Sequence, residues 1–158
     1  MLNIKELSEF LVRAKVKTYA GNGKEIKPER YGFRELEYKE GEFEYRDSYS
    51  GFYSAPGQEV VRFKGEPIWV MAYSGGMIKK YQSDFEFALK TFDVLKDALK
   101  KVDSSKPFRG PENFSKGEFV YESKVVGDVT WFKGFEKVKF KGKVVFSQDY
   151  IGGLIVQK

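Results

Sequence analysis

The chain has 158 residues, of which 28 are Lys or Arg and 23 are Asp or Glu, and it contains neither cysteine nor histidine. It therefore has no disulfide, zinc finger, thiol nucleophile, Ser-His-Asp triad or imidazole pH switch, and any bound metal would need oxygen ligands. The formal net charge is +5, but an acidic block over residues 31–60 interrupts the positive charge. A continuous basic stripe that could follow a phosphate backbone is absent.

The length is typical of one domain, and we expect a single domain over residues 1–158. Aromatic residues make up 17% of the chain, enough to build a dense core. Abundant Lys and Glu beside scarce Asn and Gln give a thermophile-like composition. No segment is apolar enough to span a membrane or to act as a signal peptide, so we expect a cytoplasmic protein with no membrane partner.

The first half of the chain predicts a helix followed by strands. Apolar residues recur at three- and four-residue spacing over residues 4–16, with Asn3 as the N-cap, which predicts a short amphipathic helix. From Arg34 onward apolar residues alternate with glutamates on both sides of Glu40-Gly41, which predicts a hairpin. A further apolar strand is expected over residues 68–73.

The second half begins with the strongest helical pattern, over residues 83–102, with Ser83 and Glu86 as a capping box. Short strands separated by Gly-containing turns should follow at residues 119–121, 129–132, 135–140 and 144–146. We therefore expect an α+β fold in which a strongly curved, mostly antiparallel sheet of about 8–9 short strands packs against one long helix, with a short N-terminal helix.

The sequence contains an internal repeat. Residues 63–77 align without gaps on residues 140–154, with six of the fifteen positions identical. Each copy consists of a Lys-Gly turn, a strand, a tyrosine and a pair of glycines. Two interpretations remain open: hairpins converge on Lys-Gly turns, or two similar substructures are arranged about one sheet.

Seven segments spread over nearly the whole chain carry a resemblance: Tyr19-Ala20-Gly21, Glu35–Tyr38, Tyr45–Tyr49, Gly57–Val60, Pro67–Met71, Tyr73–Gly76 and Tyr150–Leu154. They resemble an uncharacterised domain-of-unknown-function family, often fused to a helix-turn-helix in bacterial transcription regulators. The resemblance implies a sensor or ligand-binding role but brings no site residues or activity with it. One short helix before the sheet is too little for a DNA-reading module, so DNA binding is not expected.

Candidate site residues lie mainly at strand ends. Asp47 could bind a ligand or act as a general base, or it could simply pair with Arg46 or Arg62. Trp69 and Tyr73 share one strand face and could line an aromatic pocket or belong to the core. The full set of candidate ligand-binding residues is Asp47, Tyr49, Gln58, Trp69, Tyr73, Gly75, Gly76, Arg109, Asp149 and Tyr150.

Further candidates rest on single features. Gly75-Gly76 could hold an anion through backbone N–H groups, and Arg109 could bind a carboxylate or phosphate, or lie free on the surface. Gln58 and Glu59 alternate along a strand, so only one of them can face the site. We expect it to be Gln58, because Glu59 shares a face with the solvent-exposed positions of neighbouring strands. A looser third copy of the pattern runs from Tyr38 to Phe52 and contains Asp47. Asp149 could converge on Asp47, since both precede a tyrosine at corresponding strand ends.

Lysines 137, 139, 141 and 143 alternate with apolar residues, as on a solvated edge strand or a nucleic-acid surface.

Taken together, these features favour a small-ligand-binding or sensor domain, with no metal and with an unknown cofactor. The alternatives are an Asp/Tyr-based hydrolase or isomerase, or a protein-interaction domain without a ligand site. The expected partner is an unidentified small molecule; nucleic acid is not expected, and a homodimer is an open alternative.

Overall fold

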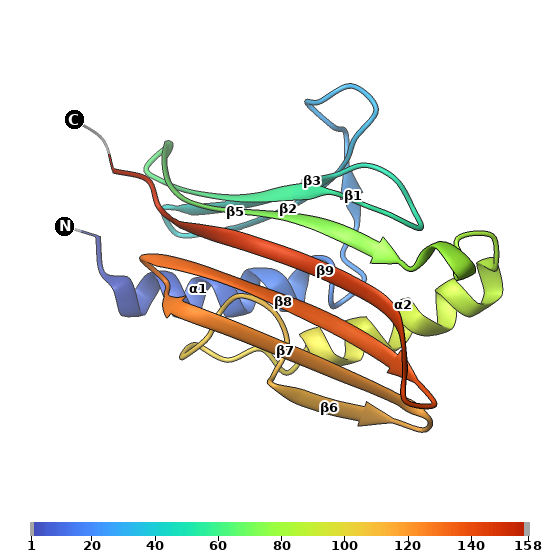
Figure 1. Cartoon of the computed structure of the whole chain (residues 1–158). Helices are drawn as coiled ribbons and strands as arrows, with labels where there is room; N and C mark the ends of the chain where they lie inside the picture. Colours follow the sequence, from blue (N-terminus) through green and yellow to red (C-terminus); the bar gives the residue numbers. More distant parts are fainter. Residues whose placement is uncertain (1, 157–158) are drawn as a thin grey trace.

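Within residues 2–156, which the computed structural model describes, the chain forms two α-helices, one 3₁₀ turn and nine strands (Figure 1). In chain order these are α1 (Ile4–Lys17), β1 (Glu25–Ile26), β2 (Arg34–Glu40), β3 (Phe43–Tyr49), β4 (Gly57–Phe63), β5 (Glu66–Met77), η1 (Lys79–Tyr81), α2 (Phe85–Leu99), β6 (Asn113–Lys116), β7 (Phe119–Asp128), β8 (Trp131–Phe140) and β9 (Lys143–Leu154).

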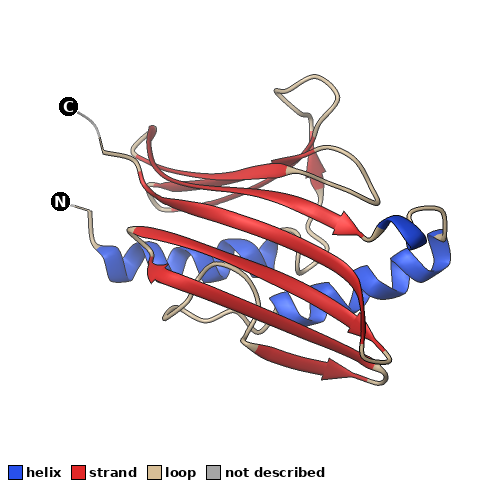
Figure 2. Cartoon of the chain, in the orientation of Figure 1, coloured by secondary structure: helices blue, strands red, loops and turns tan. Residues whose placement is uncertain are grey.

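The strands form one open antiparallel sheet in the order β1-β2-β3-β4-β5-β9-β8-β7-β6. The edges are β1 and β6, and the centre is the pair β5 and β9. Both helices lie on the same side of this sheet (Figure 2), which we call the helix face, and the opposite side is the outer face. Because side chains alternate along each strand, every second residue points into the layer beneath the helices.

The α+β class and the antiparallel sheet of nine strands are confirmed, but the proportions differ from expectation. The helices are nearly equal, with 14 residues in α1 and 15 in α2, so a contrast between one long and one short helix is not confirmed. The four longest strands have 10 or 12 residues each. Strong curvature is not supported, since the sheet is open and its two edges remain separate.

Local signals placed the first helix correctly and the second less so. The Asn3 side chain accepts hydrogen bonds from the backbone N–H groups of Lys5 and Glu6, which confirms it as the N-cap of α1. For α2 the expected cap is wrong by one residue, because Asp84 rather than Ser83 accepts the bond from Phe87 N–H. Both residue types cap helices well, so sequence alone does not separate neighbours of this kind.

β8 is one continuous strand where two short strands and a turn at Lys133-Gly134 were expected. Gly134 has a packing role instead: a Cβ atom there would lie 2.7 Å from the Tyr150 hydroxyl oxygen. β8 also lies inside the sheet, between β9 and β7, so the edge-strand explanation of its lysines is wrong. Lys139 pairs with Glu122 of the neighbouring strand at 2.7 Å.

The two copies of the internal repeat form the two central strands, β5 and β9. Tyr73 pairs directly with Tyr150 across them. On the other side of each tyrosine, Gly57 of β4 pairs with Tyr73 and Gly134 of β8 pairs with Tyr150. The segments β2–β5 and β6–β9 are therefore two similar halves, related by an approximate two-fold axis between the tyrosines. This arrangement favours two similar substructures over chance convergence of hairpin turns.

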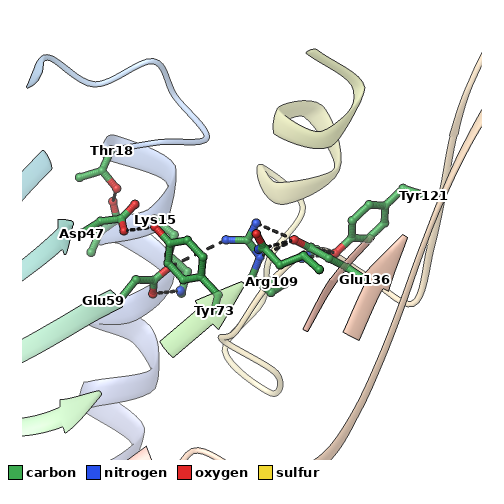
Figure 3. A network of polar contacts seen from close by, with 11 residues as sticks. Lys15, Thr18, Asp47, Glu59, Tyr73, Arg109, Tyr121 and Glu136 are labelled. Atoms are coloured by element: carbon green, nitrogen blue, oxygen red, sulfur yellow. Dashed lines mark hydrogen bonds and ion pairs between the residues drawn. The ribbon is translucent and has the colours of Figure 1, made fainter. Parts of the chain in front are cut away.

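Each half has its own helix and its own apolar core. α1 packs with Tyr45 and Trp69 in one cluster of buried residues, and α2 packs with Tyr121 and Val138 in the other. Buried polar side chains run between the two halves, from α1 across to β7 (Figure 3). The fold thus brings charged groups from distant parts of the chain to the middle of its helix face.

Candidate functional site

A cavity of about 340 Å³ opens beside these buried polar groups. Its polar lining includes Asp47, Tyr73, Arg109 and Gln148, which come from β3, β5, the loop after α2, and β9. Five aromatic side chains complete the walls, namely Tyr19, Tyr49, Phe52, Phe92 and Phe146. The volume lies within the range of about 300–1,000 Å³ usual for small-molecule sites.

The cavity exists because the two halves of the sheet are filled differently. Phe132 of the second half stacks on Trp69 of β5 at 5.6 Å between ring centres, and on Phe108 at 4.0 Å. By the register of the repeat, Ala55 stands where Phe132 does, and Phe146 stands where Trp69 does. The small methyl group of Ala55 leaves open the space that the Phe132 ring occupies in the other half.

A second difference makes the open space polar. Gln148 of β9 occupies the position that corresponds to Met71 of β5. An amide therefore faces the cavity, whereas the thioether of Met71 lies in the closely packed core beside Trp69. Met71 is fully buried in the apolar core, whereas Gln148 donates from Nε2 to the Glu136 carboxylate at 3.0 Å. The space beside Ala55 is therefore both less filled and more polar than the corresponding space around Phe132.

Gly75 and Gly76 line the cavity through close backbone packing. A Cβ atom at Gly76 would lie 2.0 Å from the Tyr53 carbonyl oxygen, and one at Gly75 would lie 2.2 Å from that of Ser147. This close approach lets the chain before β4 pair with β5, as the hydrogen bond from Ala55 N–H to the Gly75 carbonyl shows at 3.0 Å. The glycine pair thus has a structural role in forming the cavity wall.

Glu136 is the centre of the buried network (Figure 3). Its side chain is completely buried and accepts from Arg109 twice, from Nη2 at 2.7 Å and from Nε at 3.0 Å. The Tyr121 hydroxyl donates to its other oxygen at 2.7 Å. A carboxylate with this many donors is well compensated for its loss of water.

Glu59 is compensated in a similar way from the other side. It forms a buried ion pair with Lys15 of α1, and the Arg109 Nη1 atom lies 3.9 Å from its Oε1 atom. Figure 3 shows Arg109 between the two glutamates. Lys15 and Arg109 therefore neutralise Glu59 and Glu136, so neither cation of this buried network is left to pair with Asp47.

Asp47 is the third carboxyl group of the cluster and has no salt bridge to a cation within residues 2–156. It is 4% exposed, and the Tyr73 hydroxyl donates to its Oδ1 atom at 2.5 Å. Burial, and then the negative charge of Glu59, raise the pKa of Asp47 to about 7, although the Tyr73 hydrogen bond opposes this shift. Near neutral pH the Asp47 carboxyl group is therefore partly protonated and partly ionised.

The tyrosine beside it stays protonated. Burial and the nearby Asp47 carboxylate raise the pKa of Tyr73 well above its usual value, so its hydroxyl remains a donor. The Arg109 guanidinium lies 5.9 Å from the centre of the same ring. Asp47 and Tyr73 thus form a hydrogen-bonded pair at the cavity surface, in which Asp47 is the group that titrates near neutral pH.

The structure brings together six of the ten candidate residues from the sequence, all lining this cavity: Asp47, Tyr49, Tyr73, Gly75, Gly76 and Arg109. Arg109 is buried and bonded to glutamate, so the alternative of a free surface arginine is wrong. Asp47 also does not pair with Arg46, which points to the outer face and bonds Glu37 at 2.6 Å.

The other four candidates lie elsewhere. Gln58 is on the outer face, where its side-chain oxygen accepts from Arg30 at 2.9 Å, so the choice of Gln58 over Glu59 is wrong. Trp69 is fully buried core, and its indole N–H donates to the Val129 carbonyl at 3.0 Å. The aromatic pocket around Trp69 is therefore filled by protein.

Asp149 and Tyr150 point to opposite faces of β9. Asp149 is exposed on the outer face, whereas Asp47 lies buried on the helix face, so the expected convergence of the two acids is wrong. The Tyr150 hydroxyl lies 3.0 Å from the Ser123 hydroxyl, within the second half. This contact corresponds to the bond between Tyr73 and Asp47 in the first half.

The candidate set from the sequence left out most of the buried polar network, including Lys15, Glu59, Glu136 and Gln148. A signal was present for the two glutamates, because each precedes alternating apolar residues that face the core, such as Val61 after Glu59 and Val138 after Glu136. Lys15 likewise follows Ala14 on the apolar stripe of α1.

Other kinds of site find less support in residues 2–156. These residues contain no group of three or more acidic side chains that could hold a metal ion. None of the helices in this part of the chain is long and apolar enough to cross a membrane. A shallower groove of about 720 Å³ lies on the sheet beside Val126, Phe135 and Ile151, two of which are more than half exposed.

Comparison with known proteins gives one finding. Residues 47–155, more than half of the chain, match the domain of unknown function DUF5680. The match covers β4–β9 and begins at Asp47, so the segments around Tyr19 and Glu35 lie outside it, and fusion to a helix-turn-helix is not shown. No curated protein and no solved structure matches the chain. The chain belongs to the DUF5680 family.

Proposed function

We propose that this protein is a small-ligand-binding domain of the sensor type, with the cavity beside Asp47 as its binding site. The observation that carries the proposal is a cavity of about 340 Å³ whose lining combines aromatic walls with convergent buried polar groups. Small-molecule sites have this character, because apolar walls supply affinity and a few fixed polar groups supply orientation.

The internal repeat supports the proposal. The two halves share strand register and tyrosine positions, yet Phe132 of the second half, stacked on Trp69 and Phe108, fills the space that Ala55 leaves open in the first half. An open cavity in one half loses the packing that the other half retains, which costs stability. A binding role accounts for keeping that space open and polar.

The test is to fill the cavity with the corresponding residue of the second half. The variant Ala55→Phe introduces the ring that Phe132 supplies in the second half. A thermal-shift screen of metabolites should identify compounds that raise the Tm of the wild type in a concentration-dependent way but do not affect Ala55→Phe. Compounds that act equally on both proteins, or a screen without any such compound, would contradict the proposal.

A second candidate is acid–base catalysis by Asp47 and Tyr73, as in a hydrolase or isomerase. The observation that favours it is the pKa of Asp47, raised to about 7 by burial, which suits a general base near neutral pH. Under this reading, Asp47→Asn would abolish turnover of a substrate that the variant still binds. A wild-type protein that binds compounds without converting any of them would leave the binding function alone.

A further inference from the structure

The charge balance of the buried cluster indicates which ligands suit the cavity. Three carboxyl groups, Asp47, Glu59 and Glu136, share the two cations Lys15 and Arg109. We infer that the cavity binds a small organic cation, an amine or amidine on an apolar body, whose charged end contacts Asp47. This inference rests on the proposed function and names its ligand class.

Both protein cations are already engaged. Arg109 makes two hydrogen bonds to Glu136 and lies close to Glu59, and Lys15 is paired with Glu59. Among residues 2–156, Asp47 receives a hydrogen bond from the neutral Tyr73 hydroxyl alone. A buried ionised carboxylate needs a cationic partner, and the space on the open side of Asp47 is the cavity.

The polar lining offers acceptors to such a ligand. Gln148 uses its Nε2 group on Glu136, so its carbonyl oxygen remains available, and it lines the same cavity as Asp47. An ammonium group has three donors and no acceptor, and an amidinium group also carries donors alone. Asp47 and Gln148 together match such a donor-rich end.

The walls suit the rest of the molecule. Tyr19 and Tyr49 pack edge to face at 6.2 Å, and Phe52 packs edge to face on Phe92 at 5.4 Å. Aromatic faces attract organic cations and cover apolar groups. Arg34, Lys96 and Asp93 also line the cavity, so a second positive charge on the ligand would meet two cations and one acid there.

The repeat provides an independent argument. Ser123 occupies the position of Asp47 in the second half, where it contacts Tyr150 as Asp47 contacts Tyr73. The second half has a smaller pocket of about 230 Å³ beside Ser123 and Tyr150, and Phe132 fills the place that Ala55 leaves open in the first half. The carboxyl group thus lies at the larger of the two corresponding cavities, and a neutral hydroxyl lies at the smaller one.

The test uses three probes with the same ring and different charge: benzylamine, benzyl alcohol and benzoate. Their binding to the wild type, Asp47→Asn, Ser123→Ala and Ala55→Phe is measured by NMR titration. Benzylamine should bind the wild type most tightly of the three, and Ser123→Ala should bind it equally well. Asp47→Asn should bind it roughly ten- to a hundredfold more weakly, and Ala55→Phe should lose binding.

The affinity for benzylamine should also depend on pH, because protonation of Asp47 competes with the cation. With the pKa of Asp47 raised to about 7 mainly by burial, the affinity should be about 30-fold weaker at about pH 5.5 than at about pH 8.5. The titratable and charged groups that face Asp47 are Lys15 of α1, Tyr45 and Tyr49 of β3, Glu59 of β4, Tyr73 of β5, Arg109 after α2, and Tyr19.

The outcomes separate the two proposals. Binding of benzoate or benzyl alcohol as tight as that of benzylamine, lost in Ala55→Phe, would overturn the cationic ligand while supporting the binding cavity. Benzylamine binding that Asp47→Asn leaves unchanged would also overturn the inference. If none of the three probes binds the wild type, both proposals are contradicted.

Discussion

Replacing Asp47 by Asn should change how the stability of the protein depends on pH. The pKa of Asp47 is raised by burial from 3.8 to about 7, so between these values the folded state holds one proton more than the unfolded chain. Stability then falls as pH rises through this window and is lowest above it. The difference amounts to ~4 kcal/mol when the full shift is lost.

Asn cannot ionise, and its side-chain oxygen can still accept from Tyr73, so Asp47→Asn keeps the contact and removes the titration. At about pH 4 the variant and the wild type should be similar in stability. Near pH 8 the variant should be more stable, by up to ~4 kcal/mol or roughly 10 °C in Tm for a chain of this length.

The assay is urea unfolding of both proteins at intervals between about pH 4 and about pH 8, with Ser123→Ala as the matched control. Titrating groups far from Asp47 contribute equally to each protein, so the difference between the two curves reports Asp47 and the groups in contact with it. A free-energy difference that stays constant over the whole range would refute the reasoning, because it would mean that Asp47 titrates alike in the folded and unfolded chains.

Two further predictions concern the partners of the buried carboxylates. In Tyr73→Phe the pKa of Asp47 should rise above that in the wild type, because the hydroxyl that stabilises its ionised form is gone; a ¹³C-carboxyl NMR titration measures this, and an unchanged or lower value would contradict it. Glu136→Gln should destabilise the protein by ~3–5 kcal/mol, since it leaves the Arg109 charge buried without its main partner. The exposed pair of Arg13 and Glu40 is the control, and Glu40→Gln should cost less than ~1 kcal/mol in urea unfolding; equal losses in the two variants would contradict the role of burial.

Local patterns in the sequence identified the elements well. The spacing of apolar residues located α1 and α2, and alternation with glutamates located the hairpin of β2 and β3. Glycine was the least reliable signal, because it serves two purposes. Gly41 has φ +59 and forms a turn, whereas Gly134 lies within β8 and makes room for the Tyr150 ring. Sequence alone does not show which purpose applies.

The site was only partly predictable, because its members meet through contacts that are distant in the chain. Lys15 and Glu59 are 44 residues apart, and Arg109 and Glu136 are 27 apart. Their pairing depends on β9 joining β5 at the centre of the sheet, which no local pattern indicates. Glu59 was expected to share a face with the solvent-exposed positions of neighbouring strands, although its spacing to Val61, which is buried, placed it on the core side.

The central claim is that Asp47 is a buried carboxyl group without a cation, open to a cavity that a cationic ligand can enter. A ¹³C-carboxyl NMR titration of Asp47, without and with saturating benzylamine, tests it most directly. The account predicts a pKa near 7 in the free protein, where burial raises it, and a clearly lower pKa with benzylamine bound. A pKa near 3.8 in the free protein, or one that benzylamine leaves unchanged, would contradict the account.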